Sequence, residues 1–312
     1  QQKMGQVRPT GMEHGLAVNR SPALEHSADT GAVPQTMGTA AGPVVQCAKI
    51  EDIFNKQNLP NASENYLTNL KEKILGDRVV KEVFEKYVPL GTVDNNDTSP
   101  NVPYCESSEP DKTPDFKNKV HLDFQADETN QSNLGLAFLH EHGHYIDFYS
   151  LIQHNPFKYK PGQSISDDQI FQKALEHDFT KLFYQKYEEY NELKKRNVDT
   201  SHLTIYKLIE DEIRSGKTAL GNTISEDISK SNAVSDILHG LSQQGIQASA
   251  HHPPPDGKKT YWDSRSTIAK EAFANMFGYK FDPDSYLLLE YYFPTATSRF
   301  EELMAGLANG SL

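Results

Sequence analysis

One apolar segment of this chain carries an unusual density of metal-binding side chains. Residues 136–148 contain no proline and are mostly apolar, a pattern that predicts a buried helix. On a helix, residues four positions apart lie on one face, so His140 and His144 can point at a single metal ion. Burying such side chains without partners costs several kcal/mol, and a bound metal removes that cost. The segment therefore predicts a helix that holds a metal.

His140, Glu141 and His144 fit the pattern His-Glu-x-x-His, which places two imidazoles and a carboxylate around a catalytic zinc. Glu141 is rotated about 100° from His140, too far to ligate the same ion easily. It can instead take a proton from a water whose pKa zinc lowers toward roughly 7. His142 lies about 200° from His140 and is expected to pack or hydrogen-bond on the other side. The alternative is a buried helix with a few polar residues and no metal.

Composition excludes several classes of protein. The chain has 31 basic and 43 acidic residues, and its net charge of −12 argues against nucleic acid or an anionic membrane surface as a partner. No run of 18 apolar residues is present, so no membrane span is predicted, and the N-terminus lacks a secretory signal pattern. The two cysteines, Cys47 and Cys105, provide neither a disulfide framework nor a cysteine zinc cluster.

Residues 1–46 are rich in small and polar residues without apolar periodicity, which predicts a disordered leader. Residues 47–312 are expected to form one domain, with a helical insertion over about 155–230. Ser63 is expected to cap a helix that ends near Gly76. A second helix is predicted over 79–87, and a half-buried strand over 120–124 leads into the metal helix.

Within the predicted insertion, Ser166 followed by Gln169 indicates a capping box that opens a long helix. Its larger apolar residues recur at helical spacing, and such a stripe is typical of core packing. The expected stripe is Ile170, Phe171, Leu175, Phe179, Phe183, Tyr187 and Tyr190.

Catalytic zinc takes three protein ligands and a water, so one ligand must come from another segment. Glu271 is the preferred candidate, on a helix predicted over 268–278 with Ser264 or Ser266 as cap and Gly278 as its end. An acid among apolar neighbours is rarely buried without a counter-charge. Asp147 could ligate the metal, or orient His144. The further candidates are His251, His252, Glu176 and Glu210.

Tyr261 lies ten residues before Glu271. A phenol near the metal can hydrogen-bond the oxyanion that forms when water attacks a carbonyl group. The alternative is that Tyr261 and Trp262 form an interfacial pair that only packs. The sequence leaves both interpretations open.

These residues give the chain a resemblance to the anthrax lethal factor type of metallopeptidase. Residues 140–147 resemble the zinc helix of that family, and residues 269–273 resemble the helix with its glutamate ligand. Tyr261 stands where the family has a catalytic tyrosine. A second resemblance is to zincin domains of phage minor head proteins and bacterial polymorphic toxins, which share similar segments in similar order. The resemblances cover mainly residues 120–150 and 232–305, under half of the chain.

The resemblance implies an α+β, mostly helical zincin fold, with a small sheet beside the zinc helix, and a zinc-dependent endopeptidase. His140, His144 and Glu271 would hold Zn²⁺, Glu141 would act as general base, and Tyr261 would stabilise the oxyanion. The 127 positions between His144 and Glu271 are more than in lethal factor, so a helical insertion must fold aside.

Residues 42–46 resemble the leaders of proteins associated with contractile injection systems. This likeness implies a secreted or injected bacterial effector toxin that cleaves a target-cell protein and is delivered through such an apparatus. One rival is a structural or phage-particle protein whose zinc is closed off by a fourth protein ligand, His252 or Asp147. The other rival is a zinc hydrolase of a non-peptide bond.

Overall fold

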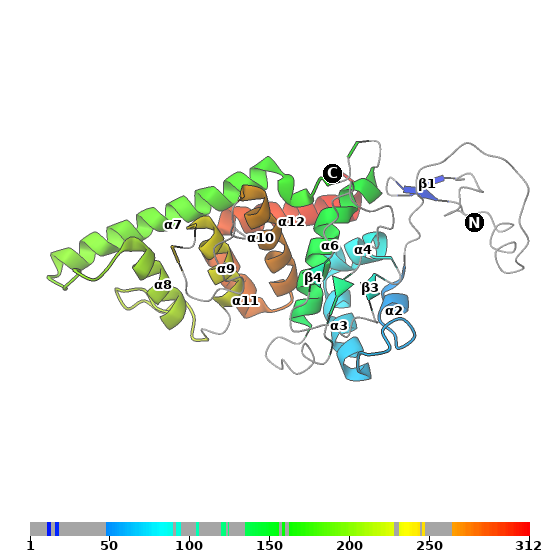
Figure 1. The fold of residues 1–312 in the computed structure, drawn as a ribbon, viewed down its shortest axis with the longest axis horizontal. Coiled ribbons are helices and arrows are strands. Elements are labelled where there is room, and N and C mark those ends of the chain that lie inside the picture. The colour runs from blue at the N-terminus through cyan, green and yellow to red at the C-terminus, as the bar shows by residue number, and fades with distance from the viewer. Residues whose placement is uncertain are drawn as a thin grey trace, which may run out of the picture. The chain divides into compact units, whose positions relative to one another are not determined.

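A computed structural model describes residues 11–13, 16–18, 48–89, 92–94, 104–105, 120–122, 124, 135–155, 158–159, 162–227, 231–243, 245–246 and 264–312. Helices dominate this part of the chain and strands are few and short, which confirms the mostly helical prediction (Figure 1). None of the helices in these ranges is long and apolar enough to cross a membrane, as the sequence predicts.

The helices and strands differ widely in length. Among the described residues, the strands are β1 (Gly11–Glu13), β2 (Leu16–Val18), β3 (Val93–Asp94), β4 (Tyr104–Cys105) and β5 (Val120–His121). The helices are α2 (Ile50–Ile53), α3 (Glu64–Gly76), α4 (Arg78–Tyr87), α6 (Leu136–His154), the 3-10 turn η2 (Ile165–Asp167), α7 (Gln169–Lys195), α8 (Ile205–Ser215), α9 (Asn232–Leu241), α10 (Arg265–Tyr279), α11 (Pro283–Tyr292) and α12 (Pro294–Asn309).

The chain divides into two compact units, residues 1–165 with 303–312, and residues 166–302. In the first unit, α4 packs against α3 and α6, and α6 lies beside β4 and β5 (Figure 1). Strand β5 is central, parallel to β3 and antiparallel to β4. The predicted strand over 120–124 is therefore present but shorter. Strands β1 and β2 pair antiparallel within the predicted leader.

Local signals explain where the helices of this unit begin. The Ser63 side chain accepts a hydrogen bond from the Tyr66 backbone N–H at 3.1 Å, which confirms it as the cap of α3. Gly135 precedes α6 with φ 79°, a conformation that favours glycine. A Cβ at Gly135 would also overlap the end of the Leu70 side chain, which would have to shift to admit a larger residue.

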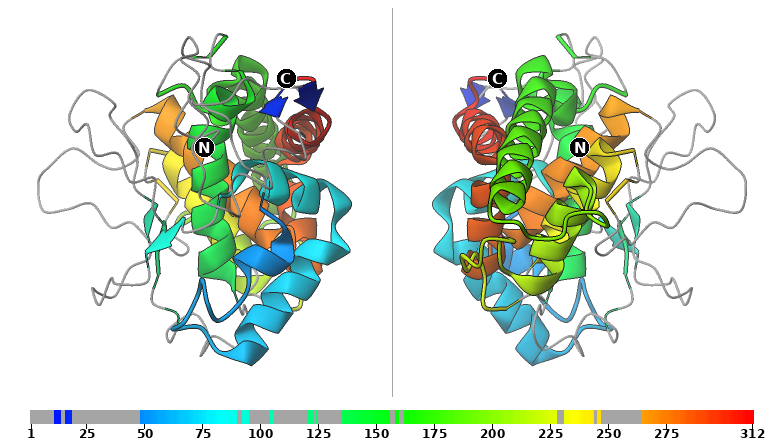
Figure 2. Two further views of the ribbon diagram at one scale, coloured as in Figure 1. Left: turned by 90° about the vertical axis from the view of Figure 1, so that its right-hand side faces the viewer. Right: turned by 90° about the vertical axis from the view of Figure 1, so that its left-hand side faces the viewer.

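The second unit is built around the 27-residue helix α7, which contacts α8, α9, α10 and α11 (Figures 1 and 2). Its N-cap differs from the prediction. Asp168, not Ser166, caps α7, because its carboxylate accepts a hydrogen bond from the Phe171 backbone N–H at 2.8 Å. The carbonyl oxygen of Ser166 accepts a hydrogen bond from Gln172 Nε2 at 3.1 Å. Arg299 also pairs with Asp168.

The predicted apolar stripe of α7 is partly wrong. Phe171 and Leu175 are buried, but Ile170 and Tyr187 are 60% and 52% exposed. The buried face includes charged residues instead, because each of these has partners within the unit. These buried residues are Phe171, Ala174, Leu175, Asp178, Leu182, Lys186, Glu189 and Leu193.

Helix α10 confirms the predicted helix with Ser264 as its cap, since the Ser264 hydroxyl accepts from the Thr267 backbone N–H at 3.1 Å. The predicted end at Gly278 is wrong by one residue, because α10 continues to Tyr279. Its neighbours in the unit include α7, α9 and α11. This packing buries the helix from Ile268 onwards almost completely.

Candidate metal centre

Helix α6 presents the two histidines of the sequence pattern side by side. The ring centroids of His140 and His144 lie 4.8 Å apart, with the ring planes nearly perpendicular. The ring of Phe148, one further turn along, stacks on His144 at 5.6 Å between centroids. Glu141 is buried on the same helix. The spacing of four residues therefore brings both imidazoles together, as predicted.

His142 faces elsewhere, as its position in the helix predicts. Its ring stacks between Phe138 and Phe84, with centroid distances of 4.0 and 5.5 Å. Its Nδ1 atom lies 2.8 Å from the carbonyl oxygen of Phe138. Burial lowers the pKa of His142 to about 4, while the hydrogen bond to Phe138 opposes that shift. The side chain is a neutral core residue.

Glu271 occupies the buried part of α10 and is only 3% exposed. A carboxylate is seldom buried to this extent without a cation or a metal nearby. Its helix neighbours Ala272 and Phe273 are fully buried apolar residues, which gives a low-polarity surrounding. This burial agrees with the sequence argument that selected Glu271.

Among the residues that the structure describes, His140, His144 and Glu271 form a group able to hold a metal ion, with one ligand atom from each within 4.8 Å of the others. Two imidazole nitrogens and a carboxylate oxygen are a donor set found at catalytic zinc. Zinc–ligand bonds of about 2.0–2.2 Å put tetrahedral ligands about 3.4 Å apart, so the three ligand atoms would draw closer together around an ion. The residues thus fit a zinc ion.

The alternative ligands have different positions. Glu176 pairs with Arg265 at 2.6 Å, and Glu210 pairs with Arg214 at 2.8 Å, as expected of charged surface helices. Asp147 is fully buried on α6 but is not part of the metal-binding group. His251, His252 and Tyr261 lie outside the described residues, so their predicted roles stay predictions.

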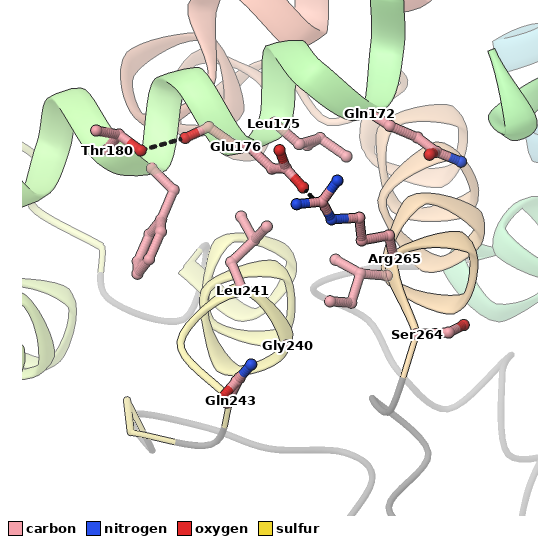
Figure 3. Close-up of a pocket in the computed structure, with 11 residues that line it drawn as sticks. Gln172, Leu175, Glu176, Thr180, Gly240, Leu241, Gln243, Ser264 and Arg265 are labelled. Atoms are coloured by element: carbon pink, nitrogen blue, oxygen red, sulfur yellow. Dashed lines mark hydrogen bonds and ion pairs between the residues drawn. The ribbon is translucent and has the colours of Figure 1, made fainter. Parts of the chain in front are cut away.

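A separate cavity of about 390 Å³ opens in the second unit beside the start of α10 (Figure 3). Figure 3 shows Arg265 of α10 and Glu176 of α7 pointing toward one another along its wall. Leu175, Leu241 and Ile268 supply apolar lining. None of the predicted catalytic or ligand residues except the rejected Glu176 lines this cavity, so it is not the candidate metal centre.

Sequence reasoning did not single out a second feature of this unit, a buried cluster of charges at Lys186, Glu189 and Glu212. The available signal was the spacing of Lys186 and Glu189, which continue the buried face of α7 at helical intervals. Charged residues at helical intervals normally indicate a solvated face, so this spacing alone does not predict a buried charge cluster.

No known family model, curated protein or solved structure matches this chain.

Proposed function

We propose that this protein is a zinc-dependent endopeptidase of the zincin type, with an α+β fold in which the small sheet lies beside the zinc helix. The observation that carries the proposal is the proximity of the three ligand atoms of His140, His144 and Glu271. In the sequence, His144 and Glu271 are 127 positions apart. Two imidazoles and a buried carboxylate gathered this closely are a donor set that a zinc ion would bind.

Each residue of the centre has a distinct task. His140, His144 and Glu271 would hold a zinc ion, which would lower the pKa of a bound water toward roughly 7 and polarise a carbonyl group. Glu141 takes the proton of the attacking water and later gives it to the leaving amine. Glu141 follows His140 directly on α6 and is 7% exposed, so bulk water has little access to its carboxylate.

Tyr261 completes this proposal as the donor of a hydrogen bond to the oxyanion that develops during attack. The resemblance of residues 42–46 to injection-system leaders adds a biological setting. In that setting the protein is a bacterial effector toxin, secreted or injected, that cleaves a protein of the target cell. The leader would then engage the delivery apparatus.

The test pairs zinc analysis with proteolysis by the full chain. We expect about one zinc per chain and cleavage of proteins in a cell extract, with new N-termini identified by mass spectrometry. Glu141→Gln should retain zinc and fold but lose activity by several orders of magnitude, since base and water act together. Glu72→Gln, on the exposed face of α3, is the matched control and should remain active.

Two outcomes would contradict the proposal. Substantial hydrolysis by zinc-loaded Glu141→Gln would remove Glu141 from the role of base. Stoichiometric zinc without cleavage of any protein would favour a structural site or a hydrolase of a non-peptide bond. A spectroscopic count of ligands on a cobalt-substituted protein separates these two, because a structural site has four protein ligands and a catalytic site three.

A further inference from the structure

A groove of about 700 Å³ lies on the second unit, between α11 and the segment that follows α8. Its apolar surface comes from Ile224, Leu287, Leu288 and Tyr291. Leu287 and Tyr291 stand four residues apart on one face of α11 and are 61% and 53% exposed. Large apolar side chains that gather at a groove mark interaction sites more often than scattered ones do.

The rim of the same groove is acidic. Glu226, Asp227 and Asp284 line it, and the lining residues that the structure describes include no lysine, arginine or histidine. Glu226 and Asp284 are both exposed, so their carboxylates are accessible to a partner. The groove therefore combines an apolar surface with negative charge at its rim.

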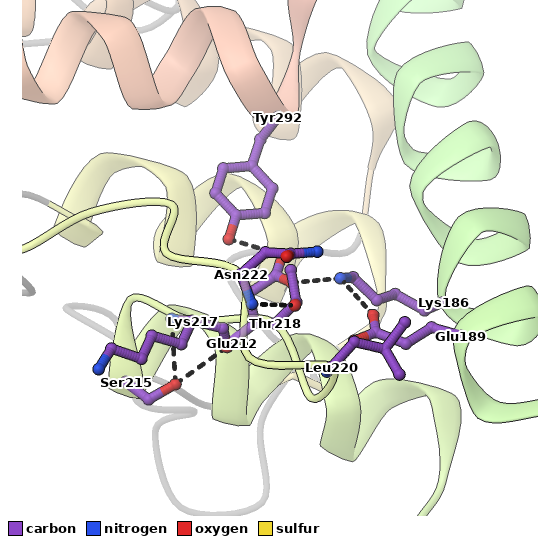
Figure 4. Close-up of polar contacts among 9 residues, drawn as sticks. All are labelled: Lys186, Glu189, Glu212, Ser215, Lys217, Thr218, Leu220, Asn222 and Tyr292. Carbon is purple, nitrogen blue, oxygen red and sulfur yellow. Dashed lines mark hydrogen bonds and ion pairs between the residues drawn. The ribbon is translucent and has the colours of Figure 1, made fainter. Parts of the chain in front are cut away.

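The wall of the groove is fixed by the buried charge cluster (Figure 4). Lys186 Nζ donates to Glu189 Oε2 at 2.8 Å and also to Glu212 Oε2. Tyr292 of α11 donates its hydroxyl to Glu212 Oε1 at 3.0 Å. The backbone N–H of Leu220 donates to Glu189 Oε1 at 3.0 Å, which ties the segment after α8 to α7.

None of the three charged residues of this cluster is among those that line the groove. Its two carboxylates surround one ammonium group, and burial raises the pKa of Glu212 while Lys186 opposes that shift. The attraction of the groove for cations therefore rests on the exposed carboxylates of Glu226, Asp227 and Asp284.

We propose that this groove docks a partner protein through an extended segment in which lysine or arginine side chains stand beside an apolar side chain. The apolar side chain contacts Leu287 and Tyr291, and the cations pair with Glu226 and Asp284. Nucleic acid or an anionic membrane would be repelled by these carboxylates. The groove contains none of the proposed zinc ligands, so this docking is independent of peptidase activity.

Fluorescence anisotropy with the full chain tests this docking. The probe is a short labelled peptide that carries several arginines beside leucines, measured on Glu141→Gln protein so that cleavage cannot intervene. Companion peptides replace arginine by glutamate or leucine by serine. We expect saturable binding of the first peptide, weakened by salt, and at least about tenfold weaker binding of both companions.

Matched variants locate the site. Glu226→Lys with Asp284→Lys, and separately Leu287→Ser, should each weaken binding at least about tenfold while the melting temperature stays unchanged. Glu72→Lys and Leu75→Ser, exposed positions on α3, are the controls for general charge and apolar effects. The proposal is overturned if the groove variants bind as the controls do, or if the glutamate peptide binds equally well.

Discussion

The Nδ1 atom of His142 lies 2.8 Å from the carbonyl oxygen of Phe138, one helical turn earlier on α6. The ring of Phe138 also stacks on the imidazole. A neutral His142 can donate its Nδ1–H to this carbonyl, and the protonated form would place a charge in a fully buried apolar site. The side chain therefore stays neutral at neutral pH and has its pKa lowered to about 4.

The low pKa of His142 predicts an acid-sensitive fold. In the unfolded chain the imidazole titrates near pKa 6.5, so below that pH the unfolded state binds a proton that the folded state binds only near pH 4. Stability is therefore full above pH 6.5 and declines as pH falls toward 4. Between pH 7 and pH 5 the free energy of unfolding should drop by roughly 2 kcal/mol from this group.

Urea unfolding of the metal-free protein at a series of pH values measures this effect, with chelator present throughout. His142→Phe keeps a ring between Phe84 and Phe138 but cannot titrate, so its stability should fall less between pH 7 and pH 5. A variant with the same pH dependence as the wild type would show that other groups cause the acid sensitivity.

Loss of the Glu271 carboxylate should weaken zinc binding. The expected readout is the rise in melting temperature on adding zinc, because a ligand at 100 times its Kd stabilises the folded state by about 2.7 kcal/mol. Glu271→Ala should lose most of that rise, and its zinc affinity should fall when measured by competition with a chelator dye.

Glu176→Ala is the matched control, because this glutamate pairs with Arg265 on the surface. It should keep the full zinc-induced rise in melting temperature. Unchanged zinc affinity in Glu271→Ala would move the third ligand to Asp147 or His252.

Much of the helical framework was predictable because its signals are local. Ser63 stands directly before an apolar period, and the Ser63 side chain caps α3 as expected. The start of α7 shows where local signals are insufficient, because Ser166 and Asp168 are both good caps. Asp168, which caps α7, also forms an ion pair with Arg299, 131 positions away. No pattern in the residues around Asp168 includes Arg299.

The same contrast applies to the candidate site. His140 and His144 are four residues apart, so helix geometry alone brings them together. Glu271 could be proposed only because an acid among buried apolar residues is unusual. Apolar periodicity does not predict the buried pair of Lys186 and Glu189, because the second partner of Lys186, Glu212, lies on another helix. The division into one domain with an insertion stays a prediction.

The role of Tyr261 is testable through kinetics. A hydroxyl that binds only the developing oxyanion should affect turnover more than substrate affinity. Tyr261→Phe should reduce kcat by about 10²-fold or more with little change in KM. Tyr184→Phe, at a position of α7 that is 64% exposed, is the control and should retain full kcat. If Tyr261→Phe lowers melting temperature and activity in parallel, the tyrosine has a packing role.

Residues 1–46 give the last prediction, because their composition predicts no contribution to the core. Deleting residues 1–45 should leave the melting temperature and peptidase activity unchanged, as measured by calorimetry and by cleavage of the substrate found in the extract. If the leader is an address for an injection apparatus, the same deletion should abolish loading into that apparatus. A fall in melting temperature of more than a few degrees would show that the leader packs on the folded chain. A rise in activity on deletion would instead identify it as an inhibitory segment lying over the catalytic residues.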